Sequence, residues 1–372
     1  MAALALFILA LLAGSLVYCL LVVVAARNYL LQTIPLPRAL EPVSVLKPLS
    51  GIDDGLEANL RSFFEQEHVE FELLFAVRDP RDPAVAVVEK LQSEFPGRRS
   101  RLVVTGEPPY PNAKVYSLDR MLALAQHDLL VMSDSDIRVA PGFLRAVASE
   151  FTDPRIALAT CPYRAIAGQS IWSQLEAEGM NTEFLAGLLV ARLIEGVRFA
   201  VGPTVAARKE ALAAIGGFAR LKDYLAEDYV LGRSAADAGL GVILSRNIVE
   251  HRIGSQGLRA NLAHRLRWVR STRRSRPFGY IGLLFTCPLP LALVLTALHP
   301  AWWPCIVGAV AFRSVAAWST SYWILGVKPQ WPLLLFQDLL SFAAWVVGFF
   351  GNTIVWRGRR YYLHSDGRFE LR

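Results

Sequence analysis

Two hydrophobic patterns divide this chain of 372 residues. Near both ends, apolar residues run almost without interruption over residues 2–26, 278–298, 301–325 and 331–355. Each run has about the 20 residues that a helix needs to cross a bilayer. Between them, from residue 42 to residue 276, short apolar runs alternate with stretches of helical periodicity. The pattern predicts membrane segments on either side of one water-exposed domain.

The middle part, 42–276, alternates strand and helix. Expected strands are 43–46, 72–77, 101–105 and 129–133, and the expected helices between them are 55–67, 83–95 and 113–125. Such alternation is typical of an α/β fold with a mostly parallel sheet. A domain of this length can also bury its own core.

The first membrane segment, residues 1–27, is expected to be an uncleaved anchor. No basic stretch precedes it, as one would in a secretory signal. Arg27, Arg38 and the linker 35–37 (PLP) follow it. Positive residues after a span favour the cytoplasmic side, so we expect the α/β domain in the cytoplasm.

The C-terminal part is read as membrane segments over 277–356 and a basic tail over 357–372. If all four apolar runs crossed the membrane, Arg357, Arg359 and Arg360 would lie on the far side, against the preference of positive residues. One C-terminal segment is therefore expected to be re-entrant or interfacial. Arg313 and Asp338 fall within apolar runs, where a charge usually faces protein or a wet cavity; Arg313 has the alternative of reaching an interface.

Composition agrees with a protein that lies partly in a membrane. The hydrophobic fraction is 53%, the formal net charge is +7 and the mean hydropathy is +0.34. The arginines between residues 265 and 276 lie beside a membrane segment and do not interleave with exposed aromatics, so anionic lipid is a better partner for them than nucleic acid. The Ala- and Arg-rich chain resembles bacterial proteins, which places it in an inner membrane.

The most informative motif is LLVMSDSD at residues 129–136. A buried strand ends there in Asp134 and Asp136, at the edge of a parallel sheet where ligands collect. Paired carboxylates can hold a divalent cation beside a phosphate. The alternative is an ordinary turn, since Asp and Ser close many strands.

Four short motifs follow one another in a recognisable order: Asp79, Asp134-Ser135-Asp136, Glu227-Asp228 and the stretch 264–268 (HRLRW). This order resembles the membrane-bound family 2-like glycosyltransferases. The stretches 45–51 (VLKPLSG), 112–115 (NAKV), 134–139 (DSDIRV) and 226–229 (AEDY) are more closely similar to the family 21 ceramide glucosyltransferases and their bacterial relatives that glycosylate hopanoid lipids.

The resemblance implies a GT-A nucleotide-sugar transferase fold with N- and C-terminal transmembrane helices. It also implies a UDP-sugar donor and a Mn²⁺ or Mg²⁺ ion. Asp134 would hold the ribose and the metal, and Asp136 the metal; Asp79 would contact the uridine. The remaining donor-site residues by this resemblance are Lys47, Asn112 and Lys114.

The acceptor side of the reaction is assigned in the same way. Inversion needs a base that removes the acceptor proton, and Asp228 matches that position of the family, with Glu227 orienting a donor hydroxyl. The alternative for Asp228 is a carboxylate that stabilises a helix N-terminus. Arg267 suits the diphosphate and Trp268 a wall near the acceptor. His264 departs from the usual Gln or Arg, which leaves its role open.

Two further features are candidates without a motif. His251 follows an expected strand and would either complete the metal shell or close the strand as a structural histidine. Residues 184–201 are apolar but interrupted by charges, which indicates an interfacial helix at the acceptor entrance or an ordinary core helix.

These features predict a membrane-bound inverting glycosyltransferase that moves a sugar, foremost glucose from UDP-glucose, to a lipid hydroxyl, foremost that of ceramide. The alternative is transfer from UDP-N-acetylglucosamine to a hopanoid. A processive polysaccharide synthase would need more spans for its channel. A silent nucleotide-sugar-binding protein would have no chemical need of both metal ligands and a base.

Overall fold

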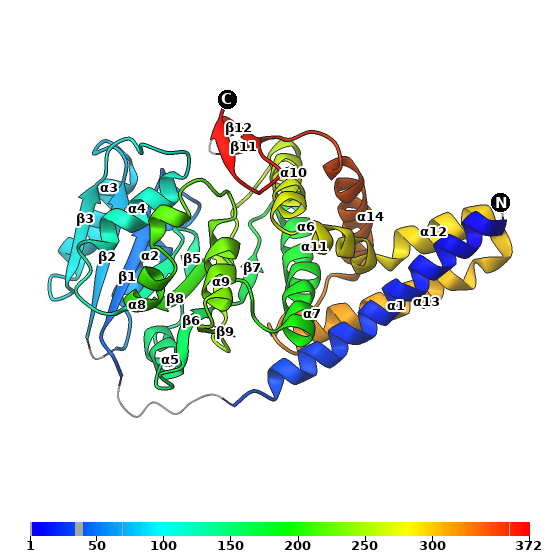
Figure 1. Ribbon diagram of the computed structural model, residues 1–372, viewed down its shortest axis with the longest axis horizontal. Helices are drawn as coiled ribbons and strands as arrows, with labels where there is room; N and C mark the ends of the chain where they lie inside the picture. Colours follow the sequence, from blue (N-terminus) through cyan, green and yellow to red (C-terminus); the bar gives the residue numbers. More distant parts are fainter. Residues whose placement is uncertain (1, 34–39, 69, 357) are drawn as a thin grey trace.

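The computed structural model describes residues 2–33, 40–68, 70–356 and 358–372. The linker 35–37, Arg38 and Arg357 lie outside these residues. The chain forms an α/β sandwich on one side and a bundle of apolar helices on the other (Figure 1). The long N-terminal helix α1 (Ala2–Leu30) runs through the helical part.

A seven-stranded sheet forms the centre of the sandwich. Its order from edge to edge is β3 (Ser100–Val104), β2 (Phe71–Val77), β1 (Val43–Pro48), β4 (Leu129–Ser133), β8 (Thr204–Arg208), β6 (Ile156–Thr160) and β9 (Gly241–Leu244). Strand β8 pairs antiparallel with both neighbours, and the other pairings are parallel. The predicted α/β class with a mostly parallel sheet is confirmed, as are all four strands expected before residue 134.

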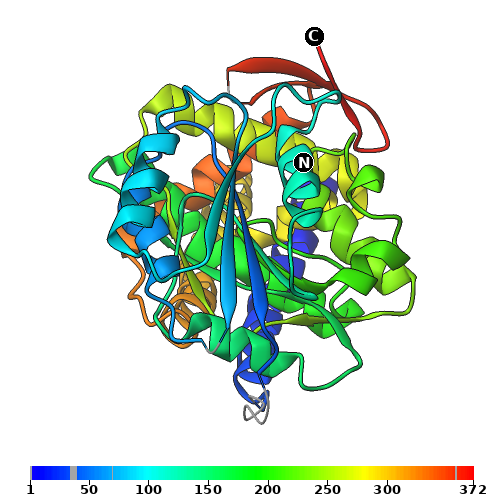
Figure 2. The ribbon, with the colours of Figure 1, turned by 90° about the vertical axis from the view of Figure 1, so that its left-hand side faces the viewer.

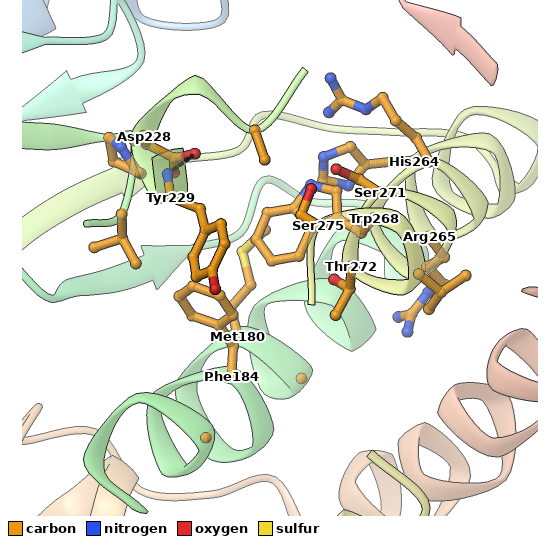
Figure 3. A pocket seen from close by; sticks show the side chains of 18 of the residues that line it. Met180, Phe184, Asp228, Tyr229, His264, Arg265, Trp268, Ser271, Thr272 and Ser275 are labelled. Carbon is orange, nitrogen blue, oxygen red and sulfur yellow. Dashed lines mark hydrogen bonds between the residues drawn. The ribbon is translucent and has the colours of Figure 1, made fainter. Parts of the chain in front are cut away.

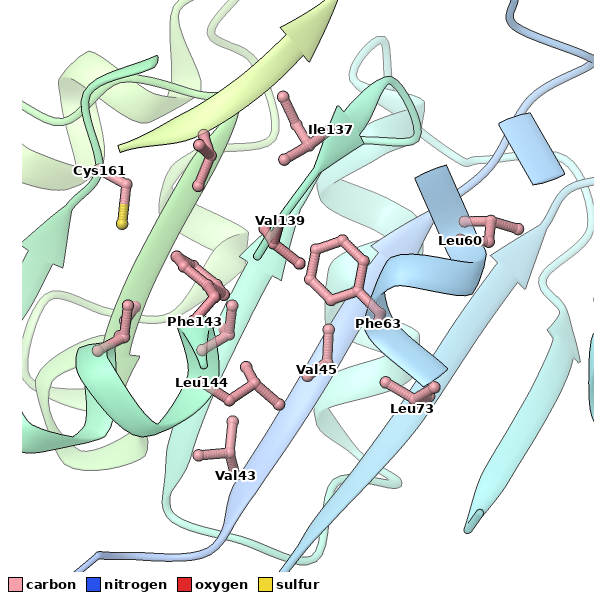
Figure 4. Packing of buried hydrophobic residues seen from close by; sticks show 14 of the residues in the cluster. Val43, Val45, Leu60, Phe63, Leu73, Ile137, Val139, Phe143, Leu144 and Cys161 are labelled. Carbon is pink, nitrogen blue, oxygen red and sulfur yellow. The ribbon is translucent and has the colours of Figure 1, made fainter. Parts of the chain in front are cut away.

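Helices cover both faces of this sheet because its strands alternate their apolar side chains between two cores. Val43 and Val45 point into the core under α2 (Leu56–Phe64), α3 (Ala84–Glu94) and α5 (Phe143–Glu150), whose Phe63 and Leu144 they meet (Figure 4). Leu46 points to the opposite core. That second core contains side chains of α4 (Ala113–Leu122), α8 (Lys209–Ala214) and α9 (Glu227–Asp237).

A second sheet, of three strands, lies next to the carboxyl end of β4, where the sequence 129–136 places its aspartates. It contains β5 (Ile137–Arg138), β10 (Val249–Arg252) and β7 (Tyr163–Ile166). Strand β10 pairs with β5, so that His251 stands opposite Ile137, and the Arg252 amide donates to the Asp136 carbonyl at 2.8 Å. The pairing brings residues 114 and 116 positions apart to one edge.

The helical part packs along one side of α1, much of whose surface is exposed. It includes α6 (Ile171–Gly179), a π-helical turn (Met180–Phe184), α7 (Leu185–Glu195), α10 (Leu258–Ser275), α11 (Pro277–Gly282), α12 (Pro288–Leu298), α13 (Pro304–Ala317) and α14 (Trp331–Gly348). Helix α1 packs against α7, α12 and α13, whereas α14 packs against α6 and α10. The expected interfacial helix 184–201 is shorter than predicted, because Gly196 with φ +75° ends it.

Fewer helices qualify as membrane spans than there are apolar runs in the sequence. Among the described residues, Ala3–Leu30 and Trp331–Gly348 are long and apolar enough to cross a membrane. A third span exists only if Pro277–Thr286 and Pro288–Leu298 count as one, and these are bent by 65°. The bend follows from Pro288, which cannot donate a backbone hydrogen bond and keeps Cys287 extended. A re-entrant or interfacial C-terminal segment was the expectation from charge; the bent pair is either a broken span or a re-entrant loop, so that expectation stays a prediction.

The two charged residues within the apolar helices, Arg313 and Asp338, form an ion pair with each other. The Arg313 Nε lies 2.9 and 3.1 Å from the two Asp338 oxygens, and its Nη2 donates to the Thr182 hydroxyl at 3.1 Å. Arg313 is 2% exposed and Asp338 0%. The protein-lined interpretation of these charges is therefore correct, and the interfacial alternative for Arg313 is wrong.

The C-terminal residues form a small sheet, where a basic tail was expected. Its strands are β11 (Thr353–Trp356), β12 (Arg359–Leu363) and β13 (Phe369–Leu371). Arginines of α10 hold it: Arg270 donates to the Thr353 carbonyl at 2.6 Å and Arg273 to the Gly351 carbonyl at 2.7 Å. Part of the arginine cluster thus binds backbone carbonyls of this chain. Both views place the sheet beside α10, above the sandwich (Figures 1 and 2).

Candidate active site

A buried lysine holds the acidic loop that follows β4, which contains Asp134 and Asp136. The Lys47 ammonium donates to the Asp134 carbonyl at 2.8 Å and lies 3.3 Å from the Ser133 hydroxyl. Lys47 is 0% exposed, and burial lowers its pKa to about 7 although Asp134 and Asp136 favour its charged form. The side chain therefore positions the loop. Direct contact with a nucleotide, which the resemblance implies, does not fit this burial.

A second lysine joins the loop to the first turn of α9. The Lys114 ammonium lies 2.7 Å from Asp134 Oδ1 and 3.1 Å from Glu227 Oε1. Burial raises the pKa of Asp134, and Lys114 opposes this effect. Two carboxylates and one ammonium thus leave an excess negative charge, which suits a site that attracts a cation.

Asp228 lies in the same first turn and faces the cavity. Its Oδ1 accepts a hydrogen bond from the Tyr229 amide at 2.8 Å. A Cβ on residue 202 would lie 3.1 Å from Asp228 Oδ2, so Gly202 permits the close approach of the carboxylate. Burial and the charge of Glu227 raise the pKa of Asp228 to about 7, against the opposing effect of Lys114. A carboxylate with such a pKa is a suitable general base near neutral pH.

Asp136 is paired with His251. The Asp136 Oδ2 lies 3.1 Å from His251 Nε2. Burial opposes charge on both groups, but their attraction outweighs it, so the pKa of His251 is raised and that of Asp136 is lowered. Asp136 Oδ1 is buried with no hydrogen-bond partner among the described residues.

This pair fits a divalent cation in part. A carboxylate oxygen and an imidazole nitrogen are suitable ligands for Mn²⁺. No group of three or more His, Cys, Asp or Glu side chains in the described part of the chain is arranged to hold a metal alone. Such ions commonly take their remaining ligands from substrate phosphates and water. His251 therefore joins Asp136 as a candidate ligand, while Asp134 Oδ1 is engaged by Lys114.

Helix α10 supplies the opposite wall with the HRLRW stretch. His264 Nδ1 lies 2.5 Å from Glu176 Oε1, and the Trp268 ring packs against both His264 and Phe184 with centroids 5.4 and 5.2 Å apart. Figure 3 shows His264 and Trp268 across the pocket from Asp228. Arg267 lines the same cavity. His264 is thus bound to a carboxylate, an arrangement that the sequence left open.

Two predicted donor residues have other surroundings. Asn112 is 0% exposed: its side chain accepts from the Val115 amide at 3.1 Å and donates to the Tyr224 carbonyl at 2.9 Å, so it caps α4. Asp79 lies in a smaller adjacent hollow and pairs with Arg81 at 3.0 Å, which lowers its pKa to about 2. Asn112 is therefore turned toward protein and does not line the main cavity, whereas Asp79 remains beside it.

One cavity of about 1240 Å³ connects these groups with the helical part. At one end it is lined by Asp134, Asp136 and Asp228, and at the other by Tyr18 and Leu21 of α1. The two ends belong to the α/β sandwich and to a candidate membrane span. The cavity therefore joins the acidic strand edge to the apolar helices.

Sequence reasoning missed several lining residues. Glu176, Glu183 and Tyr163 carry no motif and reach the cavity only through tertiary packing. Asp53 follows β1 at the same sheet edge and accepts from the Ser135 hydroxyl at 2.5 Å; a carboxylate after a strand was the available signal. Arg359 of the C-terminal sheet also lines the cavity and pairs with Glu107 at 3.0 Å.

The sandwich and its acidic strand edge define an α/β glycosyltransferase fold of the GT-A type. A solved mannosyltransferase from Pyrobaculum calidifontis, in complex with GDP-Man and Mn²⁺, has a similar fold, with a TM-score of 0.57 and 19% identity over 93% of this chain and 99% of that one. The chain belongs to glycosyl transferase family 21, whose model matches residues 5–369. Both the fold class and the family resemblance are thereby confirmed.

Curated relatives agree with this assignment. Ceramide glucosyltransferase 1 of Caenorhabditis elegans is 27% identical over 344 residues, which are 88% of this chain and 72% of that protein. Ceramide glucosyltransferase 3 of the same organism is 28% identical over 233 residues, and the match spans half of its length. The chain is thus a glycosyltransferase of a family that in general uses a nucleotide-sugar donor and a lipid acceptor.

Proposed function

We propose that this protein transfers glucose from UDP-glucose to a hydroxyl of ceramide with inversion at the anomeric carbon. The observation that carries the proposal is the continuous cavity from Asp134, Asp136 and Asp228 to Tyr18 of α1. Its polar end suits a nucleotide sugar, and its other end suits a lipid that enters from the membrane. The C. elegans relatives support ceramide as the acceptor.

In the reaction, Asp228 accepts the proton of the acceptor hydroxyl. The oxygen then attacks the anomeric carbon from the face opposite the phosphate, and the bond from that carbon to the UDP oxygen breaks. Lys114 keeps Asp134 and Glu227 in place on the donor side. Arg267, with its planar donors, lies in the cavity to bind the diphosphate.

A divalent cation, bound by Asp136 with His251 as the second side-chain ligand, would neutralise charge on the departing diphosphate. Lys47 supports this end of the site by fixing the backbone of the acidic loop. Trp268 and Phe184 form an apolar wall that excludes water from the acceptor side. Exclusion of water protects the donor from hydrolysis.

We further place the α/β domain on the cytoplasmic face of a multi-pass membrane protein. Arg27 in the last turn of α1 supports this orientation, since basic residues that follow a span favour the cytoplasm.

The test is transfer by detergent-purified protein with Mn²⁺ or Mg²⁺. Radiolabelled UDP-glucose and UDP-N-acetylglucosamine are each offered with ceramide and with a hopanoid polyol, and Asp228→Asn is the matched control. Labelled glucosylceramide made by the wild type alone is the expected result. A labelled hopanoid would overturn the acceptor, and UDP binding without any labelled lipid would favour a silent binding protein.

A further inference from the structure

A directional chain of hydrogen bonds leads from α10 to a carboxylate on the cavity wall. Arg265 Nη2 donates to Gln337 Oε1 at 2.7 Å, and Gln337 Nε2 donates to the Ser341 hydroxyl at 2.8 Å. The Ser341 hydroxyl donates to Glu183 Oε2 at 2.7 Å. From the other side, the Thr286 hydroxyl lies 3.2 Å from Glu183 Oε1, and it shares its single hydrogen with the Leu283 carbonyl at 2.8 Å. The donors converge on Glu183.

These contacts make Glu183 a hydrogen-bond acceptor that still has free capacity. An ionised carboxylate only accepts hydrogen bonds and has about four lone-pair sites. Ser341 and Thr286 use one site on each oxygen, so Glu183 retains capacity for further donors. Arg265 is itself held by the Asn261 side chain at 2.8 Å, so the chain starts from a fixed point.

The carboxylate lies where membrane helices meet. Ser341 stands in the middle of the candidate span Trp331–Gly348, and Thr286 precedes the 65° bend. Glu183 lies within the π-helical turn Met180–Phe184, a conformation frequently found at functional sites. Ionisable groups at such positions are rare and usually functional. Glu183 also lines the cavity that contains Asp228.

Two further observations concern the same region, and the first of them points to a ligand. The Tyr18 hydroxyl of α1 is buried and has no hydrogen-bond partner among the described residues, although Tyr18 lines the cavity. A Cβ at residue 179 would lie 2.4 Å from Gln337 Nε2, so Gly179 leaves room for the Gln337 side chain in this chain of hydrogen bonds. An unpaired buried hydroxyl costs free energy unless a ligand completes it.

We propose that Glu183 and Tyr18 form a head-group subsite for the lipid acceptor. Glu183 accepts a hydrogen bond from a second donor of that lipid, a hydroxyl or an amide N–H, while the reacting hydroxyl reaches Asp228. The Tyr18 hydroxyl pairs with another polar atom of the same head group. This inference rests on the proposed transfer to ceramide, whose head group carries such donors beside the reacting hydroxyl.

The experiment compares acceptors in the full-length, detergent-purified enzyme. A short-chain ceramide, its 3-deoxy analogue and its N-methyl analogue are glucosylated by the wild type, E183Q and Y18F. The matched control is E178Q, because Glu178 lies in the adjacent helix α6 and does not line the cavity, and its carboxylate accepts from the Gln330 amide. Acceptor KM, kcat and donor KM are measured for each pair.

A hydrogen bond to a charged group commonly accounts for about tenfold or more in affinity. The wild type should therefore prefer ceramide over at least one analogue by about tenfold in kcat/KM. E183Q should raise the KM for ceramide and reduce that preference, with donor KM unchanged, whereas E178Q should behave like the wild type. Y18F removes only a hydroxyl and should weaken acceptor binding in the same direction.

Several results would overturn the subsite. Undiminished discrimination by E183Q, or an equal loss on all three acceptors, would give Glu183 a purely structural role. If E183Q cannot be purified, unchanged acceptor KM in Y18F would have the same meaning. Absence of wild-type transfer to any ceramide would instead overturn the proposed acceptor, and the subsite with it.

Discussion

The charge environment of Asp228 predicts a pH profile that two substitutions should move in opposite directions. Burial and Glu227 raise the pKa of Asp228 from 3.8 to about 7, and Lys114 lowers it. A general base must be deprotonated to act. The raised pKa therefore places the acidic limb of kcat near pH 7, and activity should rise with pH through this range.

The magnitude follows from the ionised fraction. At pH 5, about 1% of a group with this pKa is ionised, so kcat should fall about tenfold per pH unit below 7. Glu227→Gln removes a like charge and should move the limb to lower pH by about one unit. Lys114→Met removes the opposing positive charge and should move it to higher pH. Tyr163 of β7 also faces Asp228, and its pKa is raised well above this range.

The assay is radiolabel transfer between pH 5 and 9 at saturating donor, acceptor and Mn²⁺, with each profile normalised to its own maximum. Normalisation separates the position of the limb from any loss of rate through poorer donor binding. Tyr163→Phe is a control that should leave the limb in place. A profile that is flat from pH 5 to 7, or a limb unmoved by Glu227→Gln, would refute the assignment of the base.

Three further predictions concern the surroundings of the site. Arg313→Met leaves the Asp338 charge buried without its cation and should cost about 3–5 kcal/mol, seen as a lower melting temperature in detergent; adding Asp338→Leu should recover most of that loss, and no recovery would contradict the pairing. Asn112→Ala removes a helix cap and should cost about 1 kcal/mol of stability while donor KM stays unchanged; a large rise in donor KM would return Asn112 to the donor site. His251→Ala should raise the Mn²⁺ concentration needed for half-maximal transfer by about tenfold or more, and an unchanged metal titration would exclude His251 as a ligand.

The sandwich was predictable because its signals are local. Strands such as 129–133 are runs of buried apolar residues, and the helices between them have clear periodicity, so their order determines the sheet type. The position of Asp134 and Asp136 followed from the same rule, since ligands collect at the ends of parallel strands. Pairing of Lys114 with Asp134 extended that prediction without contradicting it.

Other side chains have roles that depend on contacts distant in sequence. Lys47 was expected at the nucleotide, but its ammonium is used by a carbonyl 87 residues away. Asn112 is used by the Tyr224 carbonyl, 112 residues away. An Asn that precedes a helical stretch can be predicted as a helix cap. Nothing in the sequence indicated that the Asn112 side chain would also donate to the Tyr224 carbonyl. A motif identifies a residue type at a place, and tertiary contacts decide whether it faces ligand or protein.

The proposed acceptor end of the cavity explains why the motifs leave the lipid undefined. The proposed donor-site groups belong to segments that the motifs cover, whereas Tyr18, Glu183 and Ser341 come from helical segments that the motifs do not include. Proteins that share the donor chemistry can therefore differ at these three positions and take different lipids. In this chain they combine an ionisable carboxylate with two hydroxyls inside otherwise apolar helices. Such a combination stabilises a lipid whose head group donates hydrogen bonds, and it leaves polar groups unpaired with a simple alcohol, which is how a buried site gains selectivity.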